Sequence, residues 1–221
     1  MPTSVYRIDR EEYRTTCALV ARVIPVLTWR HSGLGMLQAY VLEGQAEELR
    51  VHIWHDSLRR EGIEESGLFH DHRFDLYSLV LTGLVHQAEH RLEESAAGAW
   101  STHRVLHARA AAEANKQGAE RLVDYHAAPT ALPERYSLTT RVTTVAAGWA
   151  YKFPKREFHG TNFGPGVTVT LVTKSNQDDT PARILAPYGK PIVHAFEKPL
   201  PESAWARPIS EAIAALEAVW Q

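Results

Sequence analysis

The chain has 221 residues, and its hydrophobic and charged fractions of 44% and 23% are ordinary for a globular protein. Its net charge of −2 gives no broad attraction to nucleic acid or to an anionic membrane, and its single cysteine excludes an internal disulfide. No apolar run reaches the roughly 20 residues that span a bilayer, and the N-terminal stretch is too charged for a signal peptide. We therefore expect a single cytoplasmic domain whose partner is a small molecule and not a nucleic acid or a membrane.

The first predicted element is a helix that follows Asp9. The Asp9 side chain can cap the helix, and Glu11 and Glu12 lie in the first turn, where the helix dipole favours acidic groups. Apolar side chains then recur at helical spacing on one face, namely Tyr13, Cys17, Val20, Val23 and Ile24. Cys17 is therefore predicted to be a small core residue, with a reactive thiol as the alternative.

Short strands replace helices from residue 36 onward. Runs of β-branched, aromatic and alternating residues predict strands at 36–43, 49–55, 70–82, 84–92, 101–110, 135–153 and 166–175. Residues 110–122 are expected to be helical or loop-like, and residues 210–220 form an amphipathic pattern that predicts a helix just after Pro208. This order predicts one all-β domain, an antiparallel β-barrel or sandwich. An N-terminal helical segment lies at about 1–30, the barrel at about 36–196 and a C-terminal helix at about 202–221.

Twelve histidines make metal binding the first functional hypothesis, and the pair His70 and His72 has suitable spacing. Side chains two apart on a strand point to the same face, about 7 Å from each other along the strand. Two imidazoles can therefore converge on one ion, although a third ligand is needed to hold it well. Two partly exposed strand histidines without a metal are the alternative.

A second pattern lies at residues 148–163, with the sequence GWAYKFPKREFHGTNF. Gly148 ends an alternating stretch, Pro154 favours a turn, and His159 opens the next stretch, with Asn162 shortly after it. Together with His70 and His72, these residues resemble the two motifs of the cupin superfamily over roughly residues 50–173. The resemblance implies a jelly-roll barrel with a metal site, and a homodimer as its oligomeric state. Its ligands in this sequence would be His70, His72 and His159.

Two positions depart from the cupin pattern. Leu76, seven residues before Gly83, stands where the first motif has a metal-binding glutamate, and Arg156 replaces a glycine of the second motif. The neighbouring Asp75 points to the other face of a regular strand, so it could reach the metal only at a bulge. We list Asp75 as a candidate catalytic group, with a solvated carboxylate as the alternative.

A three-histidine centre without glutamate resembles that of the thiol dioxygenases of the cysteine dioxygenase type. Open coordination positions and an uncompensated +2 charge suit an anionic substrate together with O2. The resemblance implies Fe(II), with Ni(II) or Mn(II) as alternatives, and a dioxygenase acting on a small polar metabolite such as a thiol or an amino acid. The Ser-x-His-x-Tyr series and the additional cysteine of that family are missing here. A metal-dependent isomerase, epimerase or lyase, or a non-catalytic small-molecule-binding protein, is the alternative.

Further candidate site residues come from chemistry and neighbourhood in the sequence. A carboxylate-bearing substrate would require an arginine, and the candidates are Arg59, Arg60, Arg73 and Arg156. His52 and Trp54 share one face of a predicted strand with Arg50 and could line a pocket. Tyr77 and Tyr151 flank the predicted ligands and could hydrogen-bond to substrate. For each of these eight residues a surface or core role is the alternative. The other histidines near the motifs are expected at the surface or beside the ligands, namely His86, His90, His103 and His107.

Overall fold

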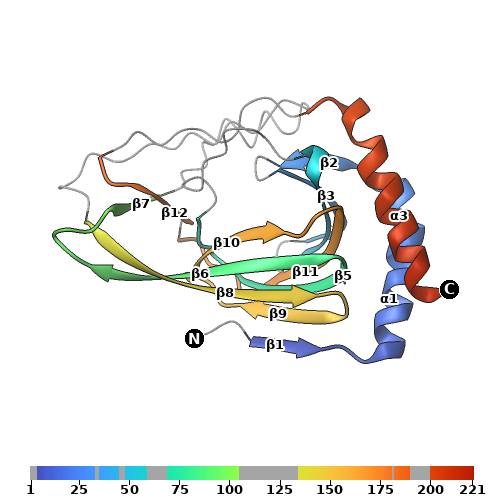
Figure 1. The fold of residues 1–221 in the computed structure, drawn as a ribbon, viewed down its shortest axis with the longest axis horizontal. Helices are drawn as coiled ribbons and strands as arrows, with labels where there is room; N and C mark the ends of the chain where they lie inside the picture. Colours follow the sequence, from blue (N-terminus) through green and yellow to red (C-terminus); the bar gives the residue numbers. More distant parts are fainter. Residues whose placement is uncertain are drawn as a thin grey trace.

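Antiparallel strands make up most of the described chain, with one long helix near each end (Figure 1). The structure is a computed structural model that describes residues 4–32, 35–44, 48–58, 69–104, 134–180, 182–189 and 200–221. Its elements are β1 (Ser4–Arg7), α1 (Arg10–Val23), η1 (Ile24–Val26), β2 (Trp29–Ser32), β3 (Met36–Glu43), β4 (Glu48–His55), η2 (Asp56–Leu58), β5 (Asp75–Thr82), β6 (Leu84–Glu94), β7 (Trp100–Arg104), β8 (Tyr136–Ala146), β9 (Trp149–Phe153), β10 (Phe158–Phe163), β11 (Val167–Ser175), β12 (Arg183–Pro187), η4 (Glu202–Ala204) and α3 (Ala206–Trp220).

The strands form two antiparallel sheets that face each other. The larger sheet has the order β1-β9-β5-β11-β4-β3-β2, and the smaller has the order β10-β6-β8-β7-β12. Residues 69–71 join the ends of the smaller sheet, because Phe69 O accepts from Leu185 N–H of β12 (2.8 Å) and His70 N–H donates to His159 O of β10 (3.0 Å). The result is a nearly closed antiparallel barrel with two terminal helices. It confirms the predicted all-β fold class, an antiparallel barrel with a helix near each end.

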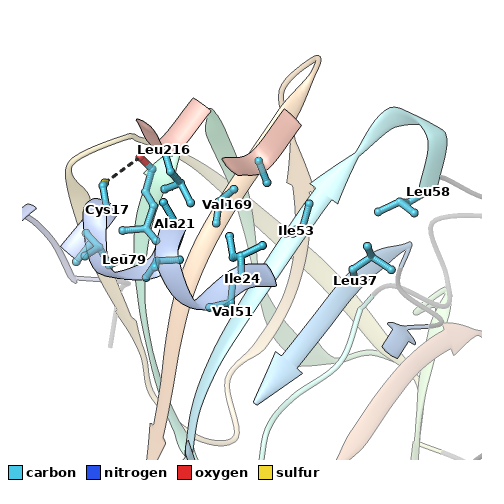
Figure 2. Close-up of a cluster of buried hydrophobic side chains, with 14 residues drawn as sticks. Cys17, Ala21, Ile24, Leu37, Val51, Ile53, Leu58, Leu79, Val169 and Leu216 are labelled. Carbon is cyan, nitrogen blue, oxygen red and sulfur yellow. Dashed lines mark hydrogen bonds between the residues drawn. The ribbon is translucent and has the colours of Figure 1, made fainter. Parts of the chain in front are cut away.

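The larger sheet separates an apolar layer from a polar interior. On β4, Val51 and Ile53 point outward toward α1 and α3, whereas His52 and Trp54 point into the barrel. This separation follows from strand geometry, since successive side chains lie on opposite faces. Figure 2 shows the outer layer, in which α1 contributes Cys17 and Ala21, α3 contributes Leu216, and the strands contribute Leu37, Val51, Ile53, Leu79 and Val169.

The two terminal helices pack side by side against this outer face (Figure 1). α1 begins after Asp9, whose side chain accepts from the N–H groups of Glu11 (2.8 Å) and Glu12 (3.3 Å), so the predicted cap is confirmed. Cys17 is fully buried and donates its Sγ–H to Leu81 O at 3.8 Å, which confirms its role in the core. α3 begins at Ala206, earlier than expected. Pro208 fits its first turn because N–H groups there need no partner within the helix.

Glycine turns connect the hairpins that lead to the two histidine motifs. Gly83, between β5 and β6, has φ of 73°, and a Cβ there would lie 2.3 Å from Thr168 Oγ1. Gly148, between β8 and β9, has φ of 81°, a backbone conformation that favours glycine. The turn at Gly83 lies where the sequence predicted a strand to end, whereas the turn at Gly148 divides the predicted strand 135–153 into β8 and β9.

Three expectations about local structure need revision or lie outside the described chain. The predicted strand 70–82 begins only at Asp75, and His70 forms an isolated bridge ahead of it. The strand predicted at 101–110 is described as far as Arg104, and its remainder, like the segment 110–122, lies outside the described residues.

No helix in the described part of the chain is long and apolar enough to cross a membrane. A homodimer and a cytoplasmic location stay predictions.

Leu216→Ala tests whether the apolar layer anchors α3. Leu216 is fully buried against the sheet, so its truncation should lower the free energy of unfolding by about 2–5 kcal/mol through lost burial and a residual cavity. Leu19→Ala on α1 is the matched control, because Leu19 is 57% exposed, and it should change the free energy by roughly 0.5 kcal/mol or less. Urea denaturation measures both, and equal losses would contradict this assignment of the core.

Candidate metal centre

Three histidines from two distant parts of the chain meet inside the barrel. His70 and His72 precede β5, and His159 is the second residue of β10. Their ring centroids form a nearly equilateral triangle, at 4.8 Å for His70–His72, 4.7 Å for His70–His159 and 4.8 Å for His72–His159. One potential ligand nitrogen from each ring lies within 4.8 Å of the other two. Since metal–nitrogen bonds are about 2.0–2.1 Å long, small ring rotations would let one ion contact all three.

The backbone holds the two motifs in register. His70 and His159 exchange two hydrogen bonds, from His70 N–H to His159 O at 3.0 Å and from His159 N–H to His70 O at 2.9 Å. The next contact is at His72, whose carbonyl accepts from Arg156 N–H at 2.9 Å. These bonds tie the histidine segment to the loop that leads into β10, so the triangle does not depend on side-chain packing alone.

Asp71 fixes the same segment from its other side. It is fully buried, and its carboxylate accepts from the backbone N–H of Arg183 (2.5 Å) and from Arg183 Nε (2.7 Å). The Arg183 guanidinium in turn lies over the ring of Phe158, the neighbour of His159, at 4.7 Å. The intervening residue of the His-Asp-His sequence therefore anchors the strand to β12 while both imidazoles point to the centre.

The environment keeps the rings of His72 and His159 uncharged. Burial, reinforced by His70 and His159, lowers the pKa of His72 well below its ordinary value. Burial and then His70 lower the pKa of His159 in the same way, although a hydrogen bond to the Glu157 backbone acts in the opposite direction. Neutral imidazoles are the form that binds a transition metal. His159 Nδ1 is buried without a hydrogen-bond partner in the described part of the protein, so this donor set fits a transition-metal ion of undetermined identity.

A cavity of about 160 Å³ opens from the histidines along the inner face of the larger sheet. Leu76 lines it, so the side chain at the expected glutamate position faces the site and supplies no ligand atom. The described residues that line it are Ser32, Met36, Gln38, Glu48, Arg50, His52, Trp54, His70, His72, Phe74, Leu76, Tyr151, His159, Thr161, Thr170, Val172 and Lys174. The volume is small compared with drug-sized pockets of roughly 300–1,000 Å³, so it suits a small metabolite.

Three of the other predicted site residues do line this cavity. Tyr151 is buried, its Oη accepts from Gln87 Nε2 at 2.7 Å, and burial raises its pKa to about 12. His52 lies beside Trp54 with the ring centroids 6.2 Å apart, and burial together with the charge of Arg50 lowers the His52 pKa to about 3. Their positions agree with roles in substrate binding, which stay predictions.

Asp75 and Tyr77 lie on the opposite face of β5 from Leu76, so neither lines the cavity. The Asp75 carboxylate accepts from Lys155 N–H (3.0 Å) and from Asn176 Nδ2 (3.3 Å), outside the barrel. The strand carries no bulge that turns Asp75 inward, and this excludes it as a metal ligand in this structure. Tyr77 packs on Tyr6 at 5.7 Å and on the outer apolar layer, away from the described lining of the cavity, and its catalytic role stays a prediction.

The arginines predicted from sequence proximity are not at the cavity wall where the structure describes them. The Arg156 guanidinium forms an ion pair with Asp178 and donates to Thr180 O at 2.7 Å. Arg156 also has φ of 69°, which explains why a glycine suits this position. Arg73 is likewise absent from the described lining, and Arg59 and Arg60 lie outside the described residues.

The sequence predictions missed Lys174 of the lining and Gln87 behind it, whereas Arg50 lies on the strand face that was predicted to line a pocket. Lys174 lies at an inward position of β11, and its strand parity, the same as that of Thr170, was a signal that could have located it. Gln87 could not have been found in this way. It connects the two sheets, since Thr161 Oγ1 donates to its Oε1 at 3.0 Å and its amide donates to Tyr151.

The other histidines near the motifs do not belong to the cluster in the described chain. His86 and His103 hydrogen-bond to Thr144 (2.9 Å) and Ser101 (2.9 Å) on the smaller sheet. His90 is buried, and its ring lies 4.0 Å from that of Phe69, the residue before His70. His107 lies outside the described residues.

No protein-family model and no curated protein sequence matches this chain. Among solved structures, it is similar to an oxalate decarboxylase variant from Bacillus subtilis, with 9% identity and a TM-score of 0.37 over 70% of this chain and 28% of that one. It is also similar to KdgF from a Halomonas species, with 14% identity and a TM-score of 0.36 over 70% and 94%. A third similar structure is a cupin 2 domain-containing protein from Halorhodospira halophila, with 11% identity and a TM-score of 0.35 over 97% and 94%. The chain thus spans less than a third of the decarboxylase.

Proposed function

We propose that this protein is a metal-dependent oxygenase that acts on a small polar metabolite at the three-histidine centre. The observation that carries the proposal is the donor set, three clustered imidazoles with Leu76 facing the cavity in place of a carboxylate. Iron(II), with nickel(II) or manganese(II) as alternatives, would supply open coordination positions and redox chemistry for the reaction of the substrate with dioxygen. A thiol or an amino acid is a suitable substrate, because each offers a soft or anionic donor to such a centre.

Apolar side chains around the histidines exclude water from the reacting region. The ring of Phe74 stacks on His72 with the centroids 4.6 Å apart, and Phe153 packs against His159 at 4.3 Å. Leu76 and Val172 complete this part of the lining. A site shielded in this way strengthens polar contacts to the substrate and limits side reactions of reactive species.

Tyr151 orients the substrate in this proposal. Its high pKa keeps the phenol protonated at neutral pH, and Gln87 donates a hydrogen bond to the phenol oxygen. The phenol hydrogen is then available to an acceptor on the substrate. Thr161 of β10, two residues after His159, holds the Gln87 amide, so the same strand positions a proposed metal ligand and this hydrogen-bond donor.

A metal-dependent isomerase, epimerase or lyase is the second candidate, and Tyr151 is the observation in its favour because a phenol can donate a proton. Such chemistry also needs a base. Within the described lining, Glu48 forms ion pairs with Arg50 and Lys174, and His52 is a weak base because its pKa is about 3. The oxygenase is therefore preferred, since its chemistry does not depend on a strong protein base.

His159→Ala should abolish stoichiometric metal binding and any dioxygen uptake. The protein loaded with iron(II) should bind about one equivalent, measured by elemental analysis, and consume dioxygen with at least one substrate from a panel of small thiols and amino acids. His86→Ala is the matched control, because His86 lies on the smaller sheet outside the cluster and should leave both readouts unchanged.

The possible outcomes separate the candidate functions. Uptake that disappears in His159→Ala but persists in His86→Ala supports the oxygenase. One bound equivalent of metal without uptake across the panel favours the isomerase, the lyase or a binding protein. A wild-type protein that binds no divalent metal would refute the proposed function as a whole.

Asp71→Asn should weaken metal affinity by about tenfold, since loss of the charge loosens the segment that carries His70 and His72. Asp75→Asn is the control on the neighbouring strand, because its carboxylate faces out of the barrel, and it should leave the affinity unchanged. Competition with a chromogenic chelator measures the affinity, and the melting temperature of each variant is recorded beside it. Equal metal affinities for the two variants would contradict the positioning role of Asp71.

A further inference from the structure

The cavity wall carries a charged cluster on the inner face of the larger sheet, formed by Glu48, Arg50 and Lys174. Arg50 Nε donates to Glu48 Oε2 at 2.7 Å, and the Lys174 ammonium forms an ion pair with the same carboxylate. The side chains of Arg50, Glu48 and Lys174 are only 21%, 11% and 10% exposed. Burial would raise the pKa of Glu48, but the hydrogen bond from Lys174 and the charge of Arg50 lower it overall, so the carboxylate is ionised.

Strand register places this cluster beside the metal-binding histidines. Lys174 pairs with Glu48 on one side and with Leu76 on the other, so its ammonium lies next to the side chain that replaces a carboxylate. Its Nζ is 5.3 Å from the centroid of Phe74, the ring that stacks on His72. A single aromatic ring therefore lies between this cation and a histidine of the triangle.

Both cations are held in place before any ligand arrives. The Arg50 guanidinium lies over the ring of Tyr40 at 4.7 Å, and the Lys174 ammonium also donates to Gln177 Oε1 at 3.1 Å. Contacts of this kind restrict long side chains and reduce the entropy lost on binding. The cluster thus presents two fixed cations and one anion to the cavity.

His52 supplies an independent sign of a ligand in the same place. It lies two residues after Arg50 on β4, lines the cavity and is 8% exposed. Its Nε2 is buried and has no hydrogen-bond partner within the described residues. A buried polar atom usually has a partner, so this nitrogen requires a polar group inside the cavity.

We propose that Arg50 and Lys174 form the anion-binding end of the cavity and that its ligand is a small dicarboxylate. One carboxylate lies against the two cations and hydrogen-bonds to His52, and the second reaches the histidine triangle. The placement of the second carboxylate rests on the proposed metal centre, whereas the placement of the first does not. The cluster carries a net charge of +1, so an anionic ligand is favoured electrostatically.

Size agrees with this ligand class. A cavity of about 160 Å³ holds the volume of roughly five water molecules at about 30 Å³ each, which leaves room for a short-chain dicarboxylate. Glu48 limits the affinity in this arrangement, because its carboxylate competes with the ligand for the same two cations. Removal of this charge should therefore act in the opposite direction from removal of either cation.

Malonate binding to the full-length protein tests the proposal, with malonamide as an uncharged ligand of similar shape. Calorimetry should show that malonate binds and that malonamide binds at least tenfold more weakly. Lys174→Met and Arg50→Met should each weaken malonate binding about tenfold or more, and Glu48→Gln should strengthen it. Arg91→Met is the matched control, since the Arg91 side chain is 82% exposed on the smaller sheet, and it should leave affinity unchanged.

Three results would overturn the proposal. The first is that the wild-type protein does not bind malonate, and the second is that it binds malonate and malonamide with equal affinity. The third is that Lys174→Met and Glu48→Gln change the affinity for malonate in the same direction, which would indicate a purely structural ion-pair network. Repeating the titration after chelator treatment separates this proposal from the metal centre. If Lys174→Met still weakens malonate binding in metal-free protein, the anion-binding end is supported, even where the wild-type protein binds no divalent metal and the proposed function is refuted. If malonate binding disappears when the metal is removed, the anion-binding end is refuted.

Discussion

The two backbone hydrogen bonds between His70 and His159 are the constraint on which the site depends. They bring a segment ahead of β5 against β10, and the same segment bonds to β12 through Phe69 and Asp71, which nearly closes the barrel. A barrel that opened here would lose its sheet pairing and its histidine triangle together. Backbone pairing is less sensitive to side-chain substitution than packing is, so the residues around the triangle can vary while the three imidazoles stay together.

The alternation of β4 explains how one strand serves both stability and chemistry. Val51 and Ile53 bury their side chains under the helices, and Arg50 and His52 project into the cavity between them. Burial of the apolar face offsets the cost of keeping charged and polar groups inside the barrel. The helices therefore support the site from the outer side of the sheet, because they bury the apolar face of the strand that carries the polar side chains of the cavity.

Much of the fold and of the histidine cluster could be predicted from the sequence, because both depend on local signals. Strand alternation, turn glycines and the Asp9 cap act over a few residues, and the spacing of two motifs predicted three histidines that the structure brings together. Proximity in the sequence failed for Arg156 and Tyr77, since a neighbouring residue on a strand or turn points elsewhere. The bond between Asp71 and Arg183 spans 112 positions, and no local pattern identifies such a partner.

One row of residues across three strands explains the electrostatics of the cavity. Glu48 of β4, Lys174 of β11 and Leu76 of β5 lie side by side in register, so the carboxylate of this row lies two strands away from the position nearest the histidines. A carboxylate in place of Leu76 would bind the metal and cancel part of its charge. Because the carboxylate of the row is Glu48 on β4, Lys174 forms its ion pair on the side away from the histidines. Its positive charge therefore acts on the histidine centre. A bound divalent ion would add to this field, and the ligand must then bring the missing negative charge.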